Sequence, residues 1–320
     1  MSTHATVTVV IPCYNQARYL RDAVRSVRGQ TYPAIECIVV DDGSTDDTAP
    51  LARTLGVRVI EQRANQGVSA ARNAGLAAAR GTFVLFLDAD DELLPDGVAR
   101  HVDALAAHPD AVAVVGRCEV MDRDGNALPV SHHAIDSSRL YEEWLSRNFV
   151  WTPGATLFRR TTLAAAGGFP AALGPSADYA LYLQLARTNH IVYVPAAIVR
   201  YRQHDASMSR DPALMLRATL DALRRERLTA PRSAHAVIRR GRRVWCDWYG
   251  EQIVEQLRRD WRERRPRLAD VRTVLTLLRR CPAVAVRHAT RKTRRTLGLA
   301  IARAWQQVPH VPATSRKAQR

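Results

Sequence analysis

The sequence predicts an α/β protein in which a mostly parallel sheet is flanked by helices and followed by a basic helical C-terminal extension. In the first part of the chain, short β-branched runs alternate with helical patterns, as they do in parallel sheets. The charge is divided unevenly: residues 1–210 contain 20 Lys and Arg and 22 Asp and Glu, whereas residues 211–320 contain 27 and 9. A chain of 320 residues with 47% hydrophobic content can also bury a full core, which argues against disorder.

Four strand and helix pairs are expected before residue 110. The strands are predicted at residues 7–11, 35–40, 57–60 and 83–87, and the helices that follow them at residues 17–28, 45–55, 68–80 and 95–107. Leu20, Val24 and Val27 lie on one face of the first helix, at the spacing of a helix that packs on a sheet. Ser44 and Asp47 have the spacing of a capping box with an acidic first turn at the start of the second helix.

The character of the chain changes after residue 110. A further strand is predicted at residues 112–116, and the sheet core is expected to end near residue 120. A polar stretch with a short helix at residues 140–145 follows. From residue 212 the pattern is helical and rich in Arg, and three prolines divide it into three or four helices: Pro231, Pro266 and Pro282.

Polar residues follow each of the four predicted strands, as Pro12-Cys-Tyr-Asn15, Asp41-Asp-Gly-Ser44, Asn65-Gln-Gly67 and Asp88-Ala-Asp-Asp91. Open parallel sheets bind ligands at the carboxyl ends of their strands, so we expect one shared site. The three crowded carboxylates of the last cluster repel one another and favour a bound Mn²⁺ or Mg²⁺, which prefer oxygen ligands. The alternative for this cluster is a helix cap, because Pro95 soon follows.

Two nucleotide-binding motifs are absent, and so are sorting signals. The first turn reads Pro12-Cys-Tyr-Asn-Gln-Ala17 instead of G-x-G-x-x-G, and G-x-x-x-x-G-K-[ST] does not occur, which argues against NAD-binding proteins and P-loop ATPases. Five cysteines without a C-x-x-C pair favour a reduced compartment. Without a recognisable signal peptide or an apolar run of ~20 residues, a cytoplasmic location is expected, at most peripheral at the inner face of the membrane.

Four motifs resemble those of family 2 glycosyltransferases, and the resemblance covers residues 6 to about 205. The motifs are Val9-Val-Ile-Pro-Cys-Tyr-Asn15, Val39-Val-Asp-Asp-Gly-Ser-Thr-Asp46, Asn65-x-Gly67 with Ala71-Arg-Asn-x-Gly75, and Phe86-Leu-Asp-Ala-Asp-Asp91. The resemblance implies a GT-A fold whose nucleotide-sugar-binding half is residues 1–120 and whose acceptor and catalytic half is residues 121–210, before the basic helical region at 211–320. It also implies inverting transfer from a nucleotide sugar, most often a UDP-sugar, to a hydroxyl of a glycan or lipid-linked acceptor, in cell-surface polysaccharide or glycoconjugate synthesis.

The resemblance also assigns donor and metal residues. The nucleotide-binding positions are Pro12, Tyr14, Asn15, Asp41, Asp42, Arg72 and Asp88, with Asp42 at the base. The D-x-D pair that holds Mn²⁺ or Mg²⁺ is matched by Asp88 and Asp90, with Asp90 as the leading ligand and with Asp91 and His204 as further candidates. The metal would stabilise the leaving nucleoside diphosphate as a Lewis acid. For Arg72 the alternative is a salt bridge on a helix surface.

An inverting transfer needs a base that takes the proton of the acceptor hydroxyl. The family places this base after a Gly-Gly-Phe segment, here Gly167-Gly-Phe169, so the matching position is Asp178, and Ala177 stands where a glutamate is usual. A helix cap is the alternative for Asp178.

A segment beside the acceptor is matched by Trp151, Thr152 and Pro153, where an aromatic ring can stack on a sugar; a buried Trp is the alternative. His132 and His133 have no partner at ligand spacing and receive no role.

The basic region has three interpretations. Arg239-Arg-Gly-Arg-Arg243 near Trp245 and Trp248, and Arg291-Lys-Thr-Arg-Arg295, fit docking on an anionic membrane surface. A solvated or oligomer-forming bundle explains the same charge without a function. Nucleic acid is an unlikely partner, because no nucleic-acid-binding motif occurs.

Two other activities compete with transfer. The first is a catalytically degenerate nucleotide-sugar-binding protein, because of Ala177. The second is a nucleotidyltransferase, which ordinarily needs a glycine-rich loop with Lys or Arg after the first strand; that loop is missing here.

Overall fold

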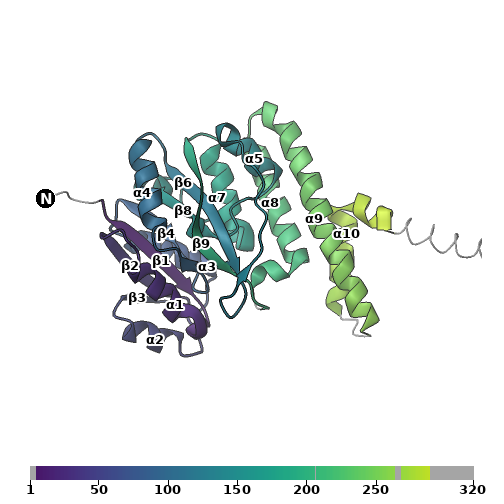
Figure 1. The fold of residues 1–320 in the computed structure, drawn as a ribbon. Helices are drawn as coiled ribbons and strands as arrows, with labels where there is room; N and C mark the ends of the chain where they lie inside the picture. The colour runs from purple at the N-terminus through teal and green to yellow at the C-terminus, as the bar shows by residue number, and fades with distance from the viewer. Residues whose placement is uncertain (1–4, 206, 264–267, 289–320) are drawn as a thin grey trace, which may run out of the picture. The chain divides into compact units, whose positions relative to one another are not determined.

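The computed structural model describes residues 5–205, 207–263 and 268–288 (Figure 1). The chain forms two compact units, Met1–Trp245 and Cys246–Arg320, which are described separately. The first unit contains the sheet, and the second begins inside a long helix.

A mixed sheet forms the centre of the first unit. The strand order is β3-β2-β1-β4-β8-β6-β9-β5, and β7 pairs with β6. The strands are β1 (Val7–Cys13), β2 (Ile35–Asp41), β3 (Arg58–Glu61), β4 (Phe83–Phe86), β5 (Glu92–Leu93), β6 (Ala113–Met121), β7 (Ala127–Leu128), β8 (Thr156–Arg159) and β9 (Ile191–Arg202). The longest ladders, β1 with β2 and β6 with β9, are parallel, which confirms the predicted mostly parallel α/β fold.

The helices of the first half lie where the periodicity predicts them. They are α1 (Ala17–Arg28), α2 (Thr48–Thr54), α3 (Val68–Ala78) and α4 (Gly97–Ala107). Leu20, Val24 and Val27 are buried, as their spacing indicates. Close packing of α3 on β1 requires Gly75, because a Cβ there would lie 2.2 Å from Cγ1 of Val10.

Two local predictions are wrong. The capping box does not form: Asp47 is the N-cap of α2 without a side-chain bond, the first turn has no acidic residue, and the Ser44 hydroxyl donates to Asp41 instead. The sheet also does not end near residue 120, because β8 lies between β4 and β6 and β9 extends along β6. The four residues of β8 are too few for a periodicity, and Pro195 interrupts the pattern of β9.

The second half of the first unit adds a helical layer. Its helices are α5 (Leu140–Ser146), α6 (Arg160–Ala165), α7 (Ala177–Ala186) and α8 (Pro212–Thr229), followed by the start of α9 (His235–Arg262). Stacked aromatic rings pack between this helical layer and the sheet. The ring centroids of Trp144 and Tyr182 are 5.5 Å apart, and those of Tyr182 and Phe158 are 6.4 Å apart. The predicted boundaries at residues 120 and 210 separate a nucleotide-sugar-binding half, an acceptor half and a basic region by their functions. These functional boundaries stay a prediction.

The second unit contains the rest of α9 and α10 (Leu268–Arg280). A disulfide joins Cys246 to Cys281, with a Cα–Cα distance of 5.4 Å, so the expectation that the cysteines are reduced is wrong for this pair. A separation of 35 residues without a motif gives the sequence no sign of it. None of the described helices is long and apolar enough to cross a bilayer. The predicted basic cluster 291–295 lies outside the described residues.

Candidate active site

The predicted strand-end clusters meet at one edge of the sheet. The backbone N–H of Asn15 donates to the Ser44 hydroxyl at 2.9 Å, and the Asn15 side-chain oxygen accepts from the N–H of Thr45 at 2.8 Å. The oxygens of Asp42 accept from the N–H groups of Gln66 and Gly67, each at 2.8 Å. The loops after β1, β2 and β3 are therefore tied together by side chains from the quoted motifs.

The remaining donor candidates lie at this edge in different environments. Pro12 is buried in β1, where it pairs in register with Val40. Asp41 and Asp42 are also buried, while Tyr14 is 41% exposed beyond the end of the strand. The exposed ring is the one candidate among these four that a ligand reaches without displacing a neighbour.

The acidic loop Asp88–Asp91, here called the DADD loop, is held by three separate segments. Arg72 of α3 donates to Asp88 at 2.6 Å, and His204 lies 2.8 Å from Asp90. Asp91 accepts from the Thr152 hydroxyl at 2.6 Å and from the backbone N–H of Arg202 at 2.9 Å. The helix-cap alternative is wrong, because α4 begins only at Gly97 with Asp96 as its N-cap.

Burial and mutual repulsion act on the carboxyl groups of the DADD loop. The pKa of Asp91 is well above its ordinary value, first because the group is buried and then because Asp90 and Asp88 are close. Burial also raises the pKa of Asp88, although Arg72 opposes this effect. A cation at the loop would relieve this repulsion.

Two carboxylates of the DADD loop fit a divalent cation. Asp88 and Asp90 each have one carboxylate oxygen that accepts no hydrogen bond within the described part of the chain. In contrast, both oxygens of Asp91 are engaged and its side chain is buried. Carboxylate oxygens suit Mn²⁺ and Mg²⁺. Among the described residues there is no group of three or more His, Cys, Asp and Glu side chains that could hold a metal ion.

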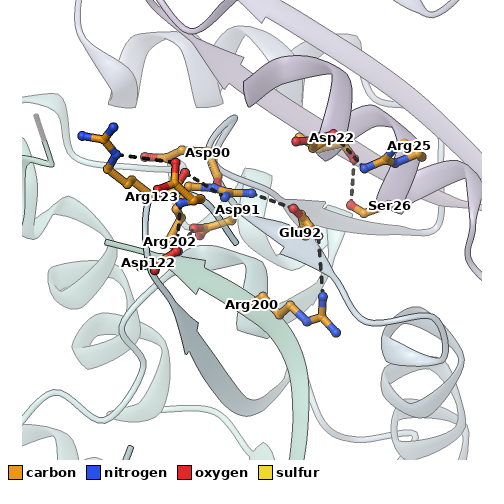
Figure 2. Close-up of polar contacts among 12 residues, drawn as sticks. Asp22, Arg25, Ser26, Asp90, Asp91, Glu92, Asp122, Arg123, Arg200 and Arg202 are labelled. Carbon is orange, nitrogen blue, oxygen red and sulfur yellow. Dashed lines mark hydrogen bonds and ion pairs between the residues drawn. The ribbon is translucent and has the colours of Figure 1, made fainter. Parts of the chain in front are cut away.

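Arg202 is a site residue that sequence reasoning missed. Its Nε donates to the backbone oxygen of Asp90 at 2.8 Å, and its Nη2 donates to Glu92 at 2.6 Å, as Figure 2 shows. The guanidinium also lies 5.0 Å from the ring centroid of Tyr19, and the residue is buried. Arg202 therefore fastens β9 to the DADD loop. Arg202 lies two residues before His204, the metal candidate predicted from the sequence, but no motif marks the arginine itself.

Helix α3 connects the DADD loop to the segment Gly167–Phe169, which precedes the predicted base. Asn73 accepts from the N–H of Phe169 at 2.8 Å and donates to its carbonyl oxygen at 2.9 Å. This clamp requires Gly168, which has φ +69° and whose added Cβ would lie 2.4 Å from Oδ1 of Asn73. Arg72 is buried with its guanidinium 5.2 Å from the Phe169 ring centroid, so the surface salt-bridge alternative is wrong.

Asp178 lies in the first turn of α7, where the charges of both Arg72 and Asp88 affect its pKa. Burial raises its pKa to about 6, while Arg72 opposes the shift and Asp88 adds to it. The N-cap of α7 is Ser176, and the Asp178 carboxylate accepts from the N–H of the adjacent Tyr179, at 2.7 Å. The helix-cap alternative is therefore wrong.

The three acceptor candidates separate. Thr152 and Pro153 are buried, and the Thr152 hydroxyl is used by Asp91. Trp151 is 38% exposed, so the buried-Trp alternative is wrong, and its ring stacks on His132 with centroids 5.6 Å apart. His132 received no role from the sequence, because no motif connects it to Trp151.

Comparison with solved structures agrees with this fold. The structure of TarS from S. aureus in complex with UDP has a TM-score of 0.55 at 21% identity, covering 76% of this chain and 70% of that one. The mannosyltransferase PcManGT of Pyrobaculum calidifontis, in complex with GDP-Man and Mn²⁺, has a TM-score of 0.58 at 18% identity, covering 96% and 89%. The fold is that of the GT-A class.

The sequence comparisons identify the family. The model for glycosyl transferase family 2 matches residues 8–166, and the chain belongs to this family. It is 37% identical over 145 residues to the uncharacterized glycosyltransferase alr2836 of Nostoc sp., covering 44% of each chain. It is 34% identical over 136 residues to the putative teichuronic acid biosynthesis glycosyltransferase TuaG of Bacillus subtilis, covering 41% of this chain and 54% of TuaG. The chain thus spans about half the length of these relatives.

Proposed function

We propose that the chain is an inverting glycosyltransferase that moves a sugar from a UDP-sugar to a hydroxyl of a glycan or lipid-linked acceptor. The observation that carries the proposal is the buried Arg72, which donates to Asp88 and whose charge also acts on Asp178. The charge of Arg72 therefore acts both on the donor side, through Asp88, and on the predicted base Asp178. Relatives named for teichuronic acid biosynthesis and as chondroitin synthase support a role in polysaccharide synthesis, and neighbours bound to UDP, UDP-GlcNAc and GDP-Man support a nucleotide-sugar donor.

In this proposal, the ends of β1 and β2 bind the nucleoside. Tyr14 supplies an exposed ring for stacking. Asp42 lies at the base beside Asp41 and Asn15, where its buried carboxylate holds the N–H groups of Gln66 and Gly67 in place. Asp90, with Asp88, holds Mn²⁺ or Mg²⁺, and His204 orients Asp90 through their 2.8 Å contact. The bound metal would supply Lewis-acid stabilisation of the leaving diphosphate. We assign Asp91 to positioning, because its two oxygens already hold Thr152 and β9.

Asp178 then takes the proton of the acceptor hydroxyl. A pKa of about 6 leaves the carboxylate ionised at neutral pH while making it a stronger base than an ordinary aspartate. Ala177 is only 1% exposed, so a glutamate at that position would need space that this chain has filled. The charge of Arg72 acts on Asp178 and favours its ionised form, which supports an active enzyme over a degenerate binding protein.

Turnover with a panel of UDP-, GDP- and dTDP-sugars in Mn²⁺ tests the proposal. Asp178→Asn should reduce transfer by about 10²–10⁴-fold, the range for general base catalysis, and leave the Kd for UDP unchanged. The control is Asp103→Asn, an exposed residue of α4. Transfer by Asp178→Asn at the control's rate would remove Asp178 from the mechanism, and absence of metal-dependent nucleotide binding in the unchanged chain would refute the donor site.

We further propose that the basic C-terminal region docks the enzyme on an anionic membrane. Residues 211–320 contain 27 Lys and Arg against 9 Asp and Glu, and in the second unit Trp248 and Trp261 are 62% and 77% exposed. An exposed row of apolar side chains also runs along α10 itself: Val271, Val274, Leu275 and Leu278. Basic residues and exposed aromatic rings together favour the interface of an anionic leaflet.

Vesicle sedimentation of the full chain tests this surface. Binding to phosphatidylglycerol vesicles should exceed binding to phosphatidylcholine vesicles and weaken with added salt, and Trp261→Ser should reduce it. Equal binding to both vesicle types, or binding that salt does not change, would contradict the proposal.

A further inference from the structure

A small cavity of the first unit lies outside the catalytic groups described above. It has a volume of about 40 Å³, and its walls include Arg117, His132, Arg147, Phe149, Trp151 and Tyr193. We call it the acceptor-side pocket. A space of this volume holds a group of the size of one or two waters, such as a carboxylate or a phosphate head, but not a sugar ring.

Arg117 brings an uncompensated positive charge to the acceptor-side pocket. The register of β6 against β9 shifts on both sides of Arg117, and such irregularities re-aim side chains. Its Nε donates to the Tyr193 hydroxyl at 2.6 Å, its guanidinium lies 5.8 Å from the Tyr193 ring centroid, and among the described residues it forms no ion pair with a carboxylate. Arg147, in the same wall, is paired with Glu143 at 3.1 Å. A phenol leaves the Arg117 charge without a counter-ion.

An aromatic platform stands beside this charge. Trp151 is partly exposed, and its ring is stacked on His132 at 5.6 Å. Burial lowers the pKa of His132, and the positive charge of Arg117 lowers it further, which favours the neutral imidazole. Exposed indole rings bind the apolar faces of sugars, and the adjacent arginine prefers an anion.

The platform is linked to the DADD loop through one peptide bond. Trp151 precedes Thr152, whose hydroxyl donates to Asp91 at 2.6 Å. Consecutive Cα atoms are about 3.8 Å apart, so a sugar on Trp151 lies next to the segment that holds the DADD loop. The segment Trp151–Thr152 therefore joins a wall of the pocket to the DADD loop.

We propose that the acceptor-side pocket binds an acidic sugar unit of the acceptor. The carboxylate or phosphate of this unit accepts hydrogen bonds from Arg117, and its ring lies against Trp151. The assignment rests on the proposed glycosyltransferase function and names the class of acceptor: an anionic glycan, which carries a charged group near the hydroxyl that is glycosylated.

The proposal is tested by measuring how simple sugars bind to the full chain, with titration calorimetry and Trp fluorescence as the two readouts. Glucuronate or glucose 6-phosphate should bind more tightly than glucose, and the tighter of the two identifies the acidic group. Arg117→Gln should weaken this binding about tenfold to a hundredfold, the range for a charge-assisted hydrogen bond, and Trp151→Phe should remove the fluorescence change. The matched control is Arg80→Gln, which removes an exposed arginine far from the pocket in sequence.

Three results would overturn the proposal: glucose binding as tightly as the acidic sugars, no binding of either acid, or unchanged affinity in a folded Arg117→Gln variant. Circular dichroism establishes that each variant is folded. Binding of UDP with Mn²⁺ to the unchanged chain separates the two hypotheses. If UDP binds and the acidic sugars do not, only the acceptor assignment fails; if UDP does not bind, the proposed function fails.

Discussion

The donor side and the acceptor side of the first unit differ in how their charged side chains are paired. On the donor side, the carboxylates of Asp42 and Asp91 each accept two hydrogen bonds from the chain itself. On the acceptor side, Arg117 has a phenol as its hydrogen-bond partner. The donor side is preorganised before any ligand arrives, whereas the acceptor side leaves one charge for the ligand to satisfy.

This difference fits the task of each side. In the proposed function, a nucleotide and a metal ion are bound by fixed carboxylates, whose geometry the protein has to maintain against their mutual repulsion. The acceptor-side pocket selects an anionic acceptor because the Arg117 guanidinium has no carboxylate partner among the described residues. A neutral ligand that cannot replace the hydration of this guanidinium binds less well. Variation in acceptor class therefore requires few changes on the acceptor side and none in the DADD loop.

The largest expected effect is the loss of Arg202, which holds the donor side. Arg202→Met should lower the free energy of unfolding by about 3 kcal/mol, because it leaves Glu92 and the DADD loop without their buried cation; the value is at the low end for broken buried pairs, since the Glu92 side chain is 22% exposed. Urea denaturation measures this change. Arg200→Met is the matched control: Arg200 also contacts Glu92, at 3.9 Å, but is 44% exposed and should cost less than about 1 kcal/mol.

Equal destabilisation by these two variants would contradict the view that the donor side depends on buried, satisfied charge. Arg202 donates to the backbone oxygen of Asp90, so Arg202→Met should also weaken metal-dependent UDP binding. A loss of this binding in Arg202→Met but not in Arg200→Met would show that the buried arginine supports the donor site as well as the fold.

The donor side was largely predictable from the sequence, because its chemistry is local. The clusters lie at or just after the carboxyl ends of parallel strands, of which β1 and β4 are fully buried, and parallel neighbours necessarily bring those ends to one edge. The residues that hold the clusters are a different matter. Arg202 is 112 residues from Asp90, and no periodicity or motif encodes that contact.

The acceptor side was less predictable for a physical reason. The stack of His132 on Trp151 and the aim of Arg117 depend on how the segment after β6 folds back, and on an irregular register between β6 and β9. Neither leaves a pattern in the chain. Likewise Thr152 resembles an acceptor residue in sequence, but its hydroxyl faces Asp91 in the structure.

The smallest expected effect distinguishes the two sides by pH. Asp178 must be ionised to accept a proton, and its pKa is raised to about 6, so kcat should fall as the pH drops through 6. For a single group with that pKa, the rate at pH 5 is about a tenth of that at pH 7. Arg72→Met should move this limb to higher pH, because the arginine's charge favours the ionised carboxylate. A pH profile of kcat at saturating acceptor measures both effects.

Arg117→Gln supplies the comparison, since it changes the acceptor side alone. It should raise the KM for an acidic acceptor and leave the acid limb of kcat where it is, because the Arg117 charge does not act on Asp178 in the way that Arg72 does. A limb near pH 4 in the unchanged chain, the ordinary range for aspartate, would mean that burial does not tune the base. A limb that moves with Arg117→Gln would mean that the two sides share one electrostatic environment, and the distinction between them would fail.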